Sequence, residues 1–239
     1  PPRPRFFLMI VRPQRSTPKP SSAESVVYKR QVYDNVLLSD DCSQIADYMI
    51  DVKKDNLIQS GMPWEKGNNM FLQDIPEKFK NYLISYRDVL TLIVSEEYEK
   101  TLYPTHSDMV LWNEGDFMIP HVDNGSRGTE QDKSILGCRE YSAVTYLNDD
   151  FEGGETFVEG YINKPLSGSV IVFPSAYEHG VNEIIKGKRV TFAMWFTQNN
   201  TKIEPSPAPV PTNDFGFLDA IHNGKPTART AATITIPYP

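Results

Sequence analysis

From about residue 107 to residue 197 the sequence consists of short runs rich in valine, isoleucine, phenylalanine, tyrosine and tryptophan, separated by turns with glycine, asparagine or aspartate. Runs of this length and composition predict β-strands. We expect seven of them, at residues 107–113, 116–122, 141–148, 155–159, 168–173, 179–185 and 188–197. Successive short strands without long intervening helices favour a β-sandwich or a distorted barrel.

Two stretches that precede these strands have helical periodicity instead. The apolar residues Cys42, Ile45, Ala46, Met49 and Val52 recur every three or four positions and predict one amphipathic helix. A second helix is expected to begin after Asp74, with Pro76 in its first turn, and to bury Phe79, Tyr82, Leu83, Tyr86, Val89, Leu90 and Ile93. Together the two patterns predict an α+β fold in which the N-terminal helices pack on the outer face of the β-core.

The last predicted strand has two different faces. One face carries only apolar residues, namely Val190, Phe192, Met194 and Phe196, and should pack against the helices or the opposing core. The other face is mixed and contains Arg189, Thr191, Ala193 and Trp195. A mixed face with one long cation is typical of the lining of a ligand cavity, so Thr191 is a further candidate contact for a bound ligand.

The two ends of the chain differ in composition from the middle. Residues 1–24 are rich in proline and basic residues and predict an irregular arm. Near the other end, residues 205–211 alternate with proline, which favours an extended polyproline II segment. We therefore expect a basic, proline-rich arm at 1–24, a single folded domain at 25–198, and a proline-rich extension at 199–239.

Composition excludes several classes of protein. The formal net charge of -7 argues against a general nucleic-acid binder, and no apolar run approaches the roughly 20 residues that span a membrane. We recognise no export signal, and Cys42 and Cys138 are not spaced as metal ligands. These features predict free thiols and a cytoplasmic location. They do not predict the oligomeric state.

The segment Ile119-Pro120-His121-Val122-Asp123 suggests a metal site. Alternate residues of a strand point to the same side, so His121 and Asp123 should lie within about 7 Å at their Cα atoms. His179, at the start of a later strand, offers a third ligand. Two histidines and one carboxylate on one face of a metal leave its other positions open, as redox-active iron(II) requires.

Arg189 lies ten residues after His179 and should face inward. A dicarboxylate that chelates a metal at one end places its other carboxylate several ångströms away, in mostly apolar surroundings. Burial of that charge requires a cation, and a guanidinium binds a carboxylate through two parallel hydrogen bonds. Tyr146 offers a further hydroxyl to the same group.

These residues together resemble the prolyl-hydroxylase branch of the iron(II)- and 2-oxoglutarate-dependent dioxygenases. The pattern of that family is His-x-Asp, a distal His, and Lys or Arg ten positions later. The resemblance covers roughly residues 107–198 and is carried by the stretches His121 to Asn124, Tyr141 to Asn148, and His179 to Val181 with Arg189. The stretch Asp149 to Glu155 looks like collagen prolyl 3-hydroxylases, whereas His121 to Asn124 is closer to oxygen-sensing prolyl hydroxylases.

The resemblance implies a double-stranded β-helix core of the jelly-roll or cupin-like type. It also implies Fe(II) held by His121, Asp123 and His179, with 2-oxoglutarate and dioxygen as cosubstrates and ascorbate as a further candidate cofactor. Arg189 and Tyr146 would contact the C5 carboxylate of 2-oxoglutarate. Trp112 stands about where many relatives have a tyrosine that touches the cosubstrate, so this contact is either lost or replaced by packing.

Three functions stay open at this point. The first is hydroxylation of prolyl residues in a proline-rich peptide or protein, for which the chain's own residues 205–211 are a candidate mimic. The second is hydroxylation of a free amino acid or small metabolite on the same scaffold. The third is a metal-binding module without turnover or a zinc hydrolase, against which Arg189 argues because zinc hydrolysis needs no distal anchor.

Three further segments carry weaker expectations. His106 and His222 lack obvious partners and are expected to be surface or packing residues. Residues 125–140 are polar, contain glycine and directly follow the metal motif. They are either a mobile flap over the substrate or a plain surface loop.

Overall fold

The structure, a computed structural model, describes residues 30–56, 61–205 and 227–229, and for 227–229 the backbone alone. The predicted arm at 1–24, His222 and the proline-alternating run after Pro205 lie outside these residues.

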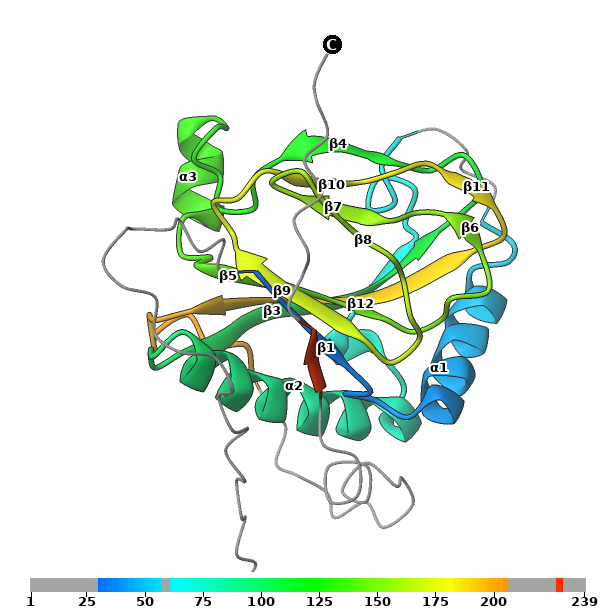
Figure 1. Ribbon diagram of the computed structural model, residues 1–239, viewed down its shortest axis with the longest axis horizontal. Helices are drawn as coiled ribbons and strands as arrows, with labels where there is room; N and C mark the ends of the chain where they lie inside the picture. Colours follow the sequence, from blue (N-terminus) through cyan, green and yellow to red (C-terminus); the bar gives the residue numbers. More distant parts are fainter. Residues whose placement is uncertain (1–29, 57–60, 206–226, 230–239) are drawn as a thin grey trace, which may run out of the picture.

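Two facing antiparallel sheets form the centre of the molecule (Figure 1). The described residues form a seven-stranded sheet in the order β13 (Thr227–Arg229), β1 (Gln31–Asp34), β9 (Val170–Pro174), β5 (Tyr141–Tyr146), β12 (Arg189–Thr197), β3 (Tyr103–Trp112) and β2 (Asn69–Phe71). Opposite it lies a smaller sheet in the order β4 (Met118–His121), β10 (His179–Val181), β7 (Thr156–Val158) and β8 (Tyr161–Asn163). A short pair, β11 (Ile184–Lys186) with β6 (Glu152–Gly153), completes the strands described.

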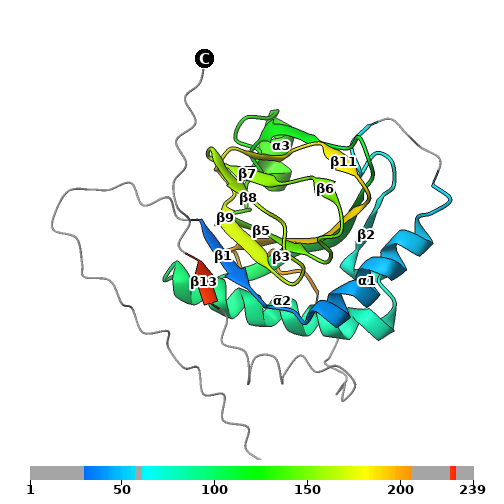
Figure 2. The same cartoon turned by 45° about the vertical axis from the view of Figure 1, so that its right-hand side comes forward.

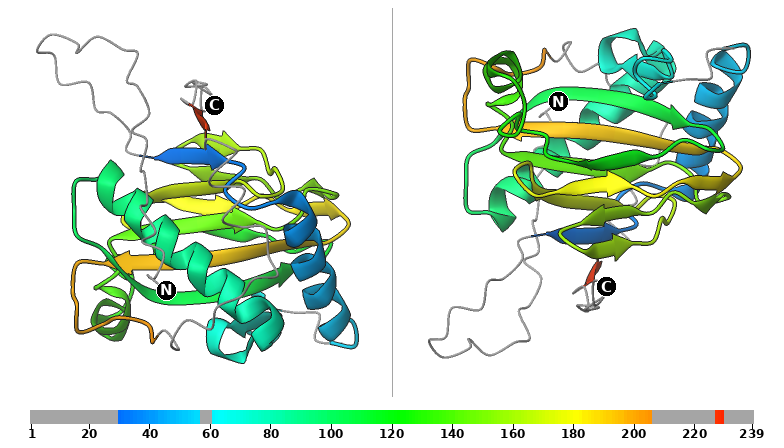
Figure 3. Two further views of the ribbon diagram at one scale, coloured as in Figure 1. Left: turned by 90° about the horizontal axis from the view of Figure 1, so that it is seen from below. Right: turned by 90° about the horizontal axis from the view of Figure 1, so that it is seen from above.

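Helices α1 (Ser39–Val52) and α2 (Glu77–Glu97) cover the outer face of the large sheet. Seen from below, α2 runs across the strands of this sheet (Figure 3). The turned view places β1 and β13 at one edge of the large sheet (Figure 2). The predicted α+β arrangement, with N-terminal helices on the outer face of the β-core, is confirmed.

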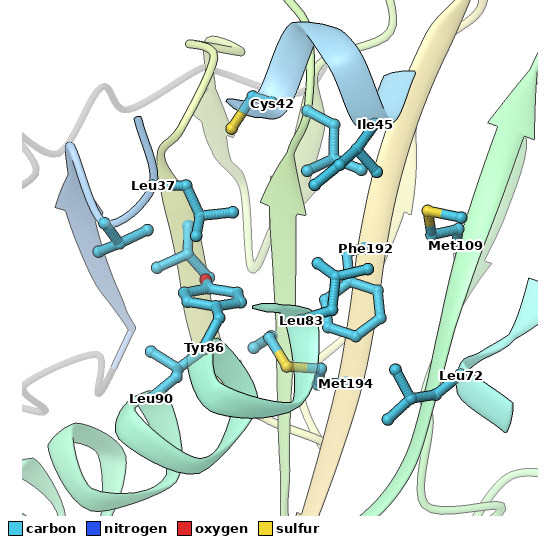
Figure 4. Close-up of a cluster of buried hydrophobic side chains, with 14 of the residues drawn as sticks. Leu37, Cys42, Ile45, Leu72, Leu83, Tyr86, Leu90, Met109, Phe192 and Met194 are labelled. Atoms are coloured by element: carbon cyan, nitrogen blue, oxygen red, sulfur yellow. The ribbon is translucent and has the colours of Figure 1, made fainter. Parts of the chain in front are cut away.

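The main hydrophobic core lies between these helices and the large sheet (Figure 4). All four apolar residues predicted for the outer face of β12 are fully buried there, namely Val190, Phe192, Met194 and Phe196. The predicted face of α1 is buried from Cys42 to Met49, but Val52 is 46% exposed, so the buried face ends one turn early. Each large side chain that is fully buried stabilises the fold by roughly 1.5–3 kcal/mol.

Several elements differ from the prediction because they are short or exposed. The predicted strand 179–185 is divided into β10 and β11 at Asn182 and Glu183, while β2, β6 and β8 have only two or three residues each. Helix α3 (Glu130–Leu136) buries none of its side chains, so it has no apolar periodicity to detect. Its start is fixed locally instead, by a capping box between Thr129 and Asp132.

Glu204 attaches the chain beyond β12 to the folded core. Its carboxylate accepts hydrogen bonds from the Arg87 Nη1 atom at 3.0 Å and from the backbone nitrogen and hydroxyl of Ser107 at 2.9 and 2.8 Å. The Arg87 side chain is fully buried, and that of Glu204 is only 14% exposed.

We expect Glu204→Ala to lower the free energy of unfolding by about 3 kcal/mol, because it removes one partner of a buried ion pair. Asp88→Ala is the matched control, since Asp88 pairs with the same guanidinium but its side chain is 54% exposed. That change should cost no more than about 1 kcal/mol. Chemical denaturation of both variants tests the difference, and equal losses would contradict it.

None of the helices in the described ranges combines the length and the apolar character that a membrane crossing needs.

Candidate active site

The pairing of β4 with β10 brings the two histidines of the predicted metal site together. His179 lies directly opposite His121 in the register of these antiparallel strands, and their ring centroids are 4.3 Å apart. Asp123 follows β4, and its backbone nitrogen donates to the carbonyl of Ser175 at 2.9 Å. One ligand atom from each of the three residues lies within 4.8 Å of the others.

The second ring nitrogen of each histidine fixes the tautomer. His121 Nδ1 lies 3.0 Å from the carbonyl oxygen of Ile119, and His179 Nδ1 lies 2.9 Å from that of Tyr177. A carbonyl oxygen only accepts, so Nδ1 carries the proton and Nε2 keeps its lone pair in the neutral ring. Both Nε2 atoms face the Asp123 carboxylate, at 3.5 and 3.3 Å. This is the orientation that metal-binding histidines adopt.

Two donors hold the Asp123 carboxylate in place. Ser142 Oγ and Trp195 Nε1 both donate to Oδ2, at 2.7 and 2.8 Å. Burial alone would raise the pKa of Asp123, but its contacts with His179, His121 and Ser142 lower it well below its usual range. The carboxylate is therefore ionised and ready to bind a cation.

The donor set fits ferrous iron. Two imidazole nitrogens and one carboxylate oxygen converge from a single sheet and its adjoining loop, and a set of only three protein ligands leaves positions of a bound metal for other ligands. His121 is the more accessible histidine, with its side chain 34% exposed against 8% for His179. Entry to the site is therefore open on the β4 side.

At the other end of β12, Arg189 presents a buried positive charge. Its Nη2 atom donates to Thr156 Oγ1 at 3.0 Å, whereas Nε and Nη1 make no hydrogen bond with any described residue. Burial lowers the pKa of Arg189, and Tyr146 partly offsets this effect. A buried guanidinium with unused donors is costly unless an anion binds to it.

The other three predicted cosubstrate residues surround this arginine. Trp112 is its register partner on β3, with the ring centroid 5.1 Å from the guanidinium carbon, and Thr191 is the next inward residue of β12. Tyr146 also lies 5.2 Å from that carbon, but its hydroxyl donates to Thr156 Oγ1 at 2.6 Å. The structure therefore brings all four residues together and directs the tyrosine hydroxyl to Thr156.

Sequence reasoning missed four supporting residues, namely Thr156, Asn163, Ser142 and Trp195. Thr156 accepts from both Arg189 and Tyr146, and Asn163 Nδ2 donates to the Tyr146 hydroxyl at 3.2 Å. Both lie on three-residue strands that carry no periodic signal. The inward position of Trp195 was predictable from the alternation in β12, but its hydrogen bond to Asp123 was not.

The segment at 125–140 contains α3 and contacts the histidine-bearing strand. Arg127 forms an ion pair with Glu178, the residue that precedes His179. Both side chains are largely exposed, so this pair contributes little to stability. Whether the segment closes over a substrate stays a prediction.

Comparison of sequences finds one family model and several relatives that match part of the chain. Residues 107–197 match the family model of the 2OG-Fe(II) oxygenase superfamily. The chain is 48% identical to prolyl 3-hydroxylase 2 of Homo sapiens over 68 residues, which is 25% of this chain and 10% of that protein. It is 36% identical to prolyl 3-hydroxylase 1 of Gallus gallus over 91 residues, 32% of this chain and 13% of that protein. The match thus spans only about a tenth of the length of these relatives.

Comparison of structures identifies the fold. A prolyl-4-hydroxylase of Pseudomonas putida aligns with a TM-score of 0.55 and 20% identity, over 73% of this chain and 95% of that one. A viral collagen prolyl hydroxylase from Paramecium Bursaria Chlorella virus-1 aligns with a TM-score of 0.54 and 15% identity, over 72% of this chain and 96% of that one. The expected double-stranded β-helix core is confirmed.

Proposed function

Residues 107–197 are a 2OG-Fe(II) oxygenase domain similar to those of prolyl hydroxylases, and from this we propose that the chain hydroxylates prolyl residues of a peptide or protein. In this proposal His121, Asp123 and His179 bind iron(II), and 2-oxoglutarate and dioxygen are the cosubstrates. More specifically, we propose that these substrates are rich in proline.

The observation that carries this function is the buried guanidinium of Arg189. Nε and Nη1 have no partner among the described residues, and they lie on the same inner face of β12 that leads to Trp195 and the metal-binding carboxylate. A dianion that chelates a metal at one end and needs a cation at the other fits this arrangement. A zinc hydrolase has no use for such a cation.

Iron and 2-oxoglutarate, when bound, supply the oxidising chemistry, in which decarboxylation to succinate is coupled to hydroxylation. The protein supplies orientation and charge. Arg189 offers two donors to the C5 carboxylate, and Trp112 Nε1, which is also buried without a partner among the described residues, offers a third. Thr156 Oγ1 already accepts two hydrogen bonds, so its own proton is free to donate to the same group.

Ser142 and Trp195 have a separate task at the metal end. Both donate to one oxygen of Asp123, which leaves the other carboxylate oxygen and the two Nε2 atoms to face a metal ion. Such outer hydrogen bonds fix the geometry of the ligands, and their loss typically costs 10–100-fold in metal affinity.

A peptide with the sequence of residues 205–211, Pro-Ser-Pro-Ala-Pro-Val-Pro, is a suitable first probe. We expect it to stimulate succinate formation in the presence of Fe(II), 2-oxoglutarate and ascorbate, and to gain about 16 Da by mass spectrometry. Free L-proline and the same peptide with every proline replaced by alanine are the controls. Stimulation by free proline alone would favour a small-molecule hydroxylase, and release of succinate without any mass gain would contradict hydroxylation of the peptide.

A further inference from the structure

The inner face of β3 and β12 carries a group of buried polar atoms that make no hydrogen bond with the described residues. They are Nε and Nη1 of Arg189, Nε1 of Trp112 and Oδ1 of Asp108. Buried polar atoms are normally paired, so each unpaired atom calls for an explanation. Their common location suggests that ligands of the site supply the missing partners.

Three of these atoms are donors and one is an acceptor. The donors match 2-oxoglutarate, which at neutral pH has two carboxylates and a ketone and can only accept hydrogen bonds. Asp108 Oδ1 does not match it. Neither dioxygen nor a bare metal ion carries a hydrogen to donate, so among the reactants only the substrate can supply a hydrogen-bond donor to Asp108.

Asp108 also lies near residues that support the proposed metal site. In the register of the large sheet it is opposite Ala193, one inward position from Trp195, whose indole donates to the metal-binding Asp123. His106, the next inward residue of β3, has its ring 5.4 Å from that of Trp195 and Nε2 4.0 Å from Asp108 Oδ2. Asp108 is therefore at the metal end of the inner face, away from the arginine that binds the cosubstrate.

Its neighbours only partly stabilise the ionised carboxyl group. Trp64 Nε1 donates to Oδ2 at 3.2 Å, and the side chain of Asn69 acts in the same direction. Burial nevertheless raises the pKa of Asp108 to about 7. The protein therefore holds a fully buried carboxyl group that is stabilised less than an ordinary Asp, as expected if one donor is still to arrive.

We propose that Asp108 is a specificity-determining residue, whose carboxylate accepts a hydrogen bond from the backbone N–H of the residue that follows the target proline. This rests on the proposed function. Proline has no N–H of its own, and the nearest backbone donor to its ring is the amide attached to its carbonyl carbon. Ala193, opposite Asp108, is the smallest inward side chain of β12 and offers the floor on which the ring packs.

The test compares two peptides that differ only in this donor. One has the sequence of residues 205–211, and the other has the same sequence with N-methylated Ser, Ala and Val, so that no proline is followed by an N–H. Affinities are measured without oxygen, in the presence of Fe(II) and 2-oxoglutarate. Wild type should bind the unmethylated peptide about 10–100-fold more tightly, the range for a hydrogen bond to a charged group. In Asp108→Ala and Asp108→Asn, the ratio of the affinity for the unmethylated peptide to that for the methylated peptide should be at least tenfold smaller than in wild type.

The pH dependence separates this role from a structural one. The affinity of wild type for the unmethylated peptide should rise between pH 6 and 8, as Asp108 ionises, and should be flat in Asp108→Asn. Burial and Arg139 lower the pKa of His106 to about 4, so this neighbour stays neutral over that range. Arg139 and Glu204 are the other charges that act on Asp108.

Asp47→Asn, which removes an exposed charge from α1, is the matched control and should keep the wild-type ratio. Equal ratios in wild type and both Asp108 variants would overturn the proposal, and so would failure of wild type to bind either peptide. Hydroxylation without any preference for the N–H peptide refutes the role of Asp108 and leaves the proposed function standing. Preference for the N–H peptide without hydroxylation supports the role of Asp108 and refutes the proposed function.

Discussion

Asp123→Ala is expected to abolish metal binding at micromolar Fe(II) and with it all substrate-coupled succinate formation. The substitution removes the one charged ligand of the three, and it leaves the donors Ser142 and Trp195 without the acceptor that they share. The loss in metal affinity should exceed the roughly 10–100-fold that follows from removing an outer partner of a ligand. Equilibrium dialysis of the metal and succinate release measure the two effects independently.

Ser142→Ala is the graded comparison for this prediction. It removes one of the two hydrogen bonds to Asp123 Oδ2 and leaves all three proposed ligands in place. Metal affinity should fall within the 10–100-fold range, and excess Fe(II) should restore most of the turnover. Full activity of Asp123→Ala would refute the metal site, whereas equal losses in the two variants would show that the carboxylate acts as a structural residue.

The convergence of the metal site was predictable because it depends on strand periodicity. His121 and Asp123 are separated by one residue, and Arg189 shares a face with Trp195 six residues later. Alternation along a strand fixes which side chains point the same way. The pairing of His179 with His121 is a different matter, since it depends on β10 lying next to β4, 58 residues earlier at the register position. The sequence offered His179 as a third ligand by its place at the start of a strand, and the family resemblance implied the complete set.

The direction of single hydrogen bonds was beyond the sequence. Tyr146 was expected to contact the cosubstrate directly, and the structure directs its hydroxyl to Thr156, which in turn accepts from Arg189. This relay requires β7 to face β5 and β12 across the two sheets, a long-range contact that no local pattern encodes. Asp108 is a similar case, because the reason for a fully buried carboxylate in β3 is visible only from the residues opposite it in the sheet.

Replacement of Arg189 should weaken the binding of 2-oxoglutarate strongly and at the same time stabilise the ligand-free protein. Arg189→Met keeps the length and apolar stem of the side chain but removes the buried charge. Affinity for 2-oxoglutarate should fall about 100-fold or more, as is usual when one partner of a buried charge pair is lost. Metal affinity should be unchanged, because the guanidinium bonds to Thr156 and to none of the proposed ligands.

The same substitution should stabilise the protein in the absence of 2-oxoglutarate. The ligand-free protein buries a cation with two unused donors, and replacing such a charge with an apolar group of similar volume is often neutral or stabilising by 1–4 kcal/mol. Arg189→Lys is the matched variant, which keeps the charge and loses the two-pronged geometry, so its affinity for 2-oxoglutarate should lie between wild type and Arg189→Met. Calorimetric titration of 2-oxoglutarate without oxygen, together with thermal unfolding of the ligand-free forms, tests both signs. If Arg189→Met bound 2-oxoglutarate like wild type, Arg189 would not be part of the cosubstrate site. The strongest reason to assign a dicarboxylate cosubstrate would then be lost.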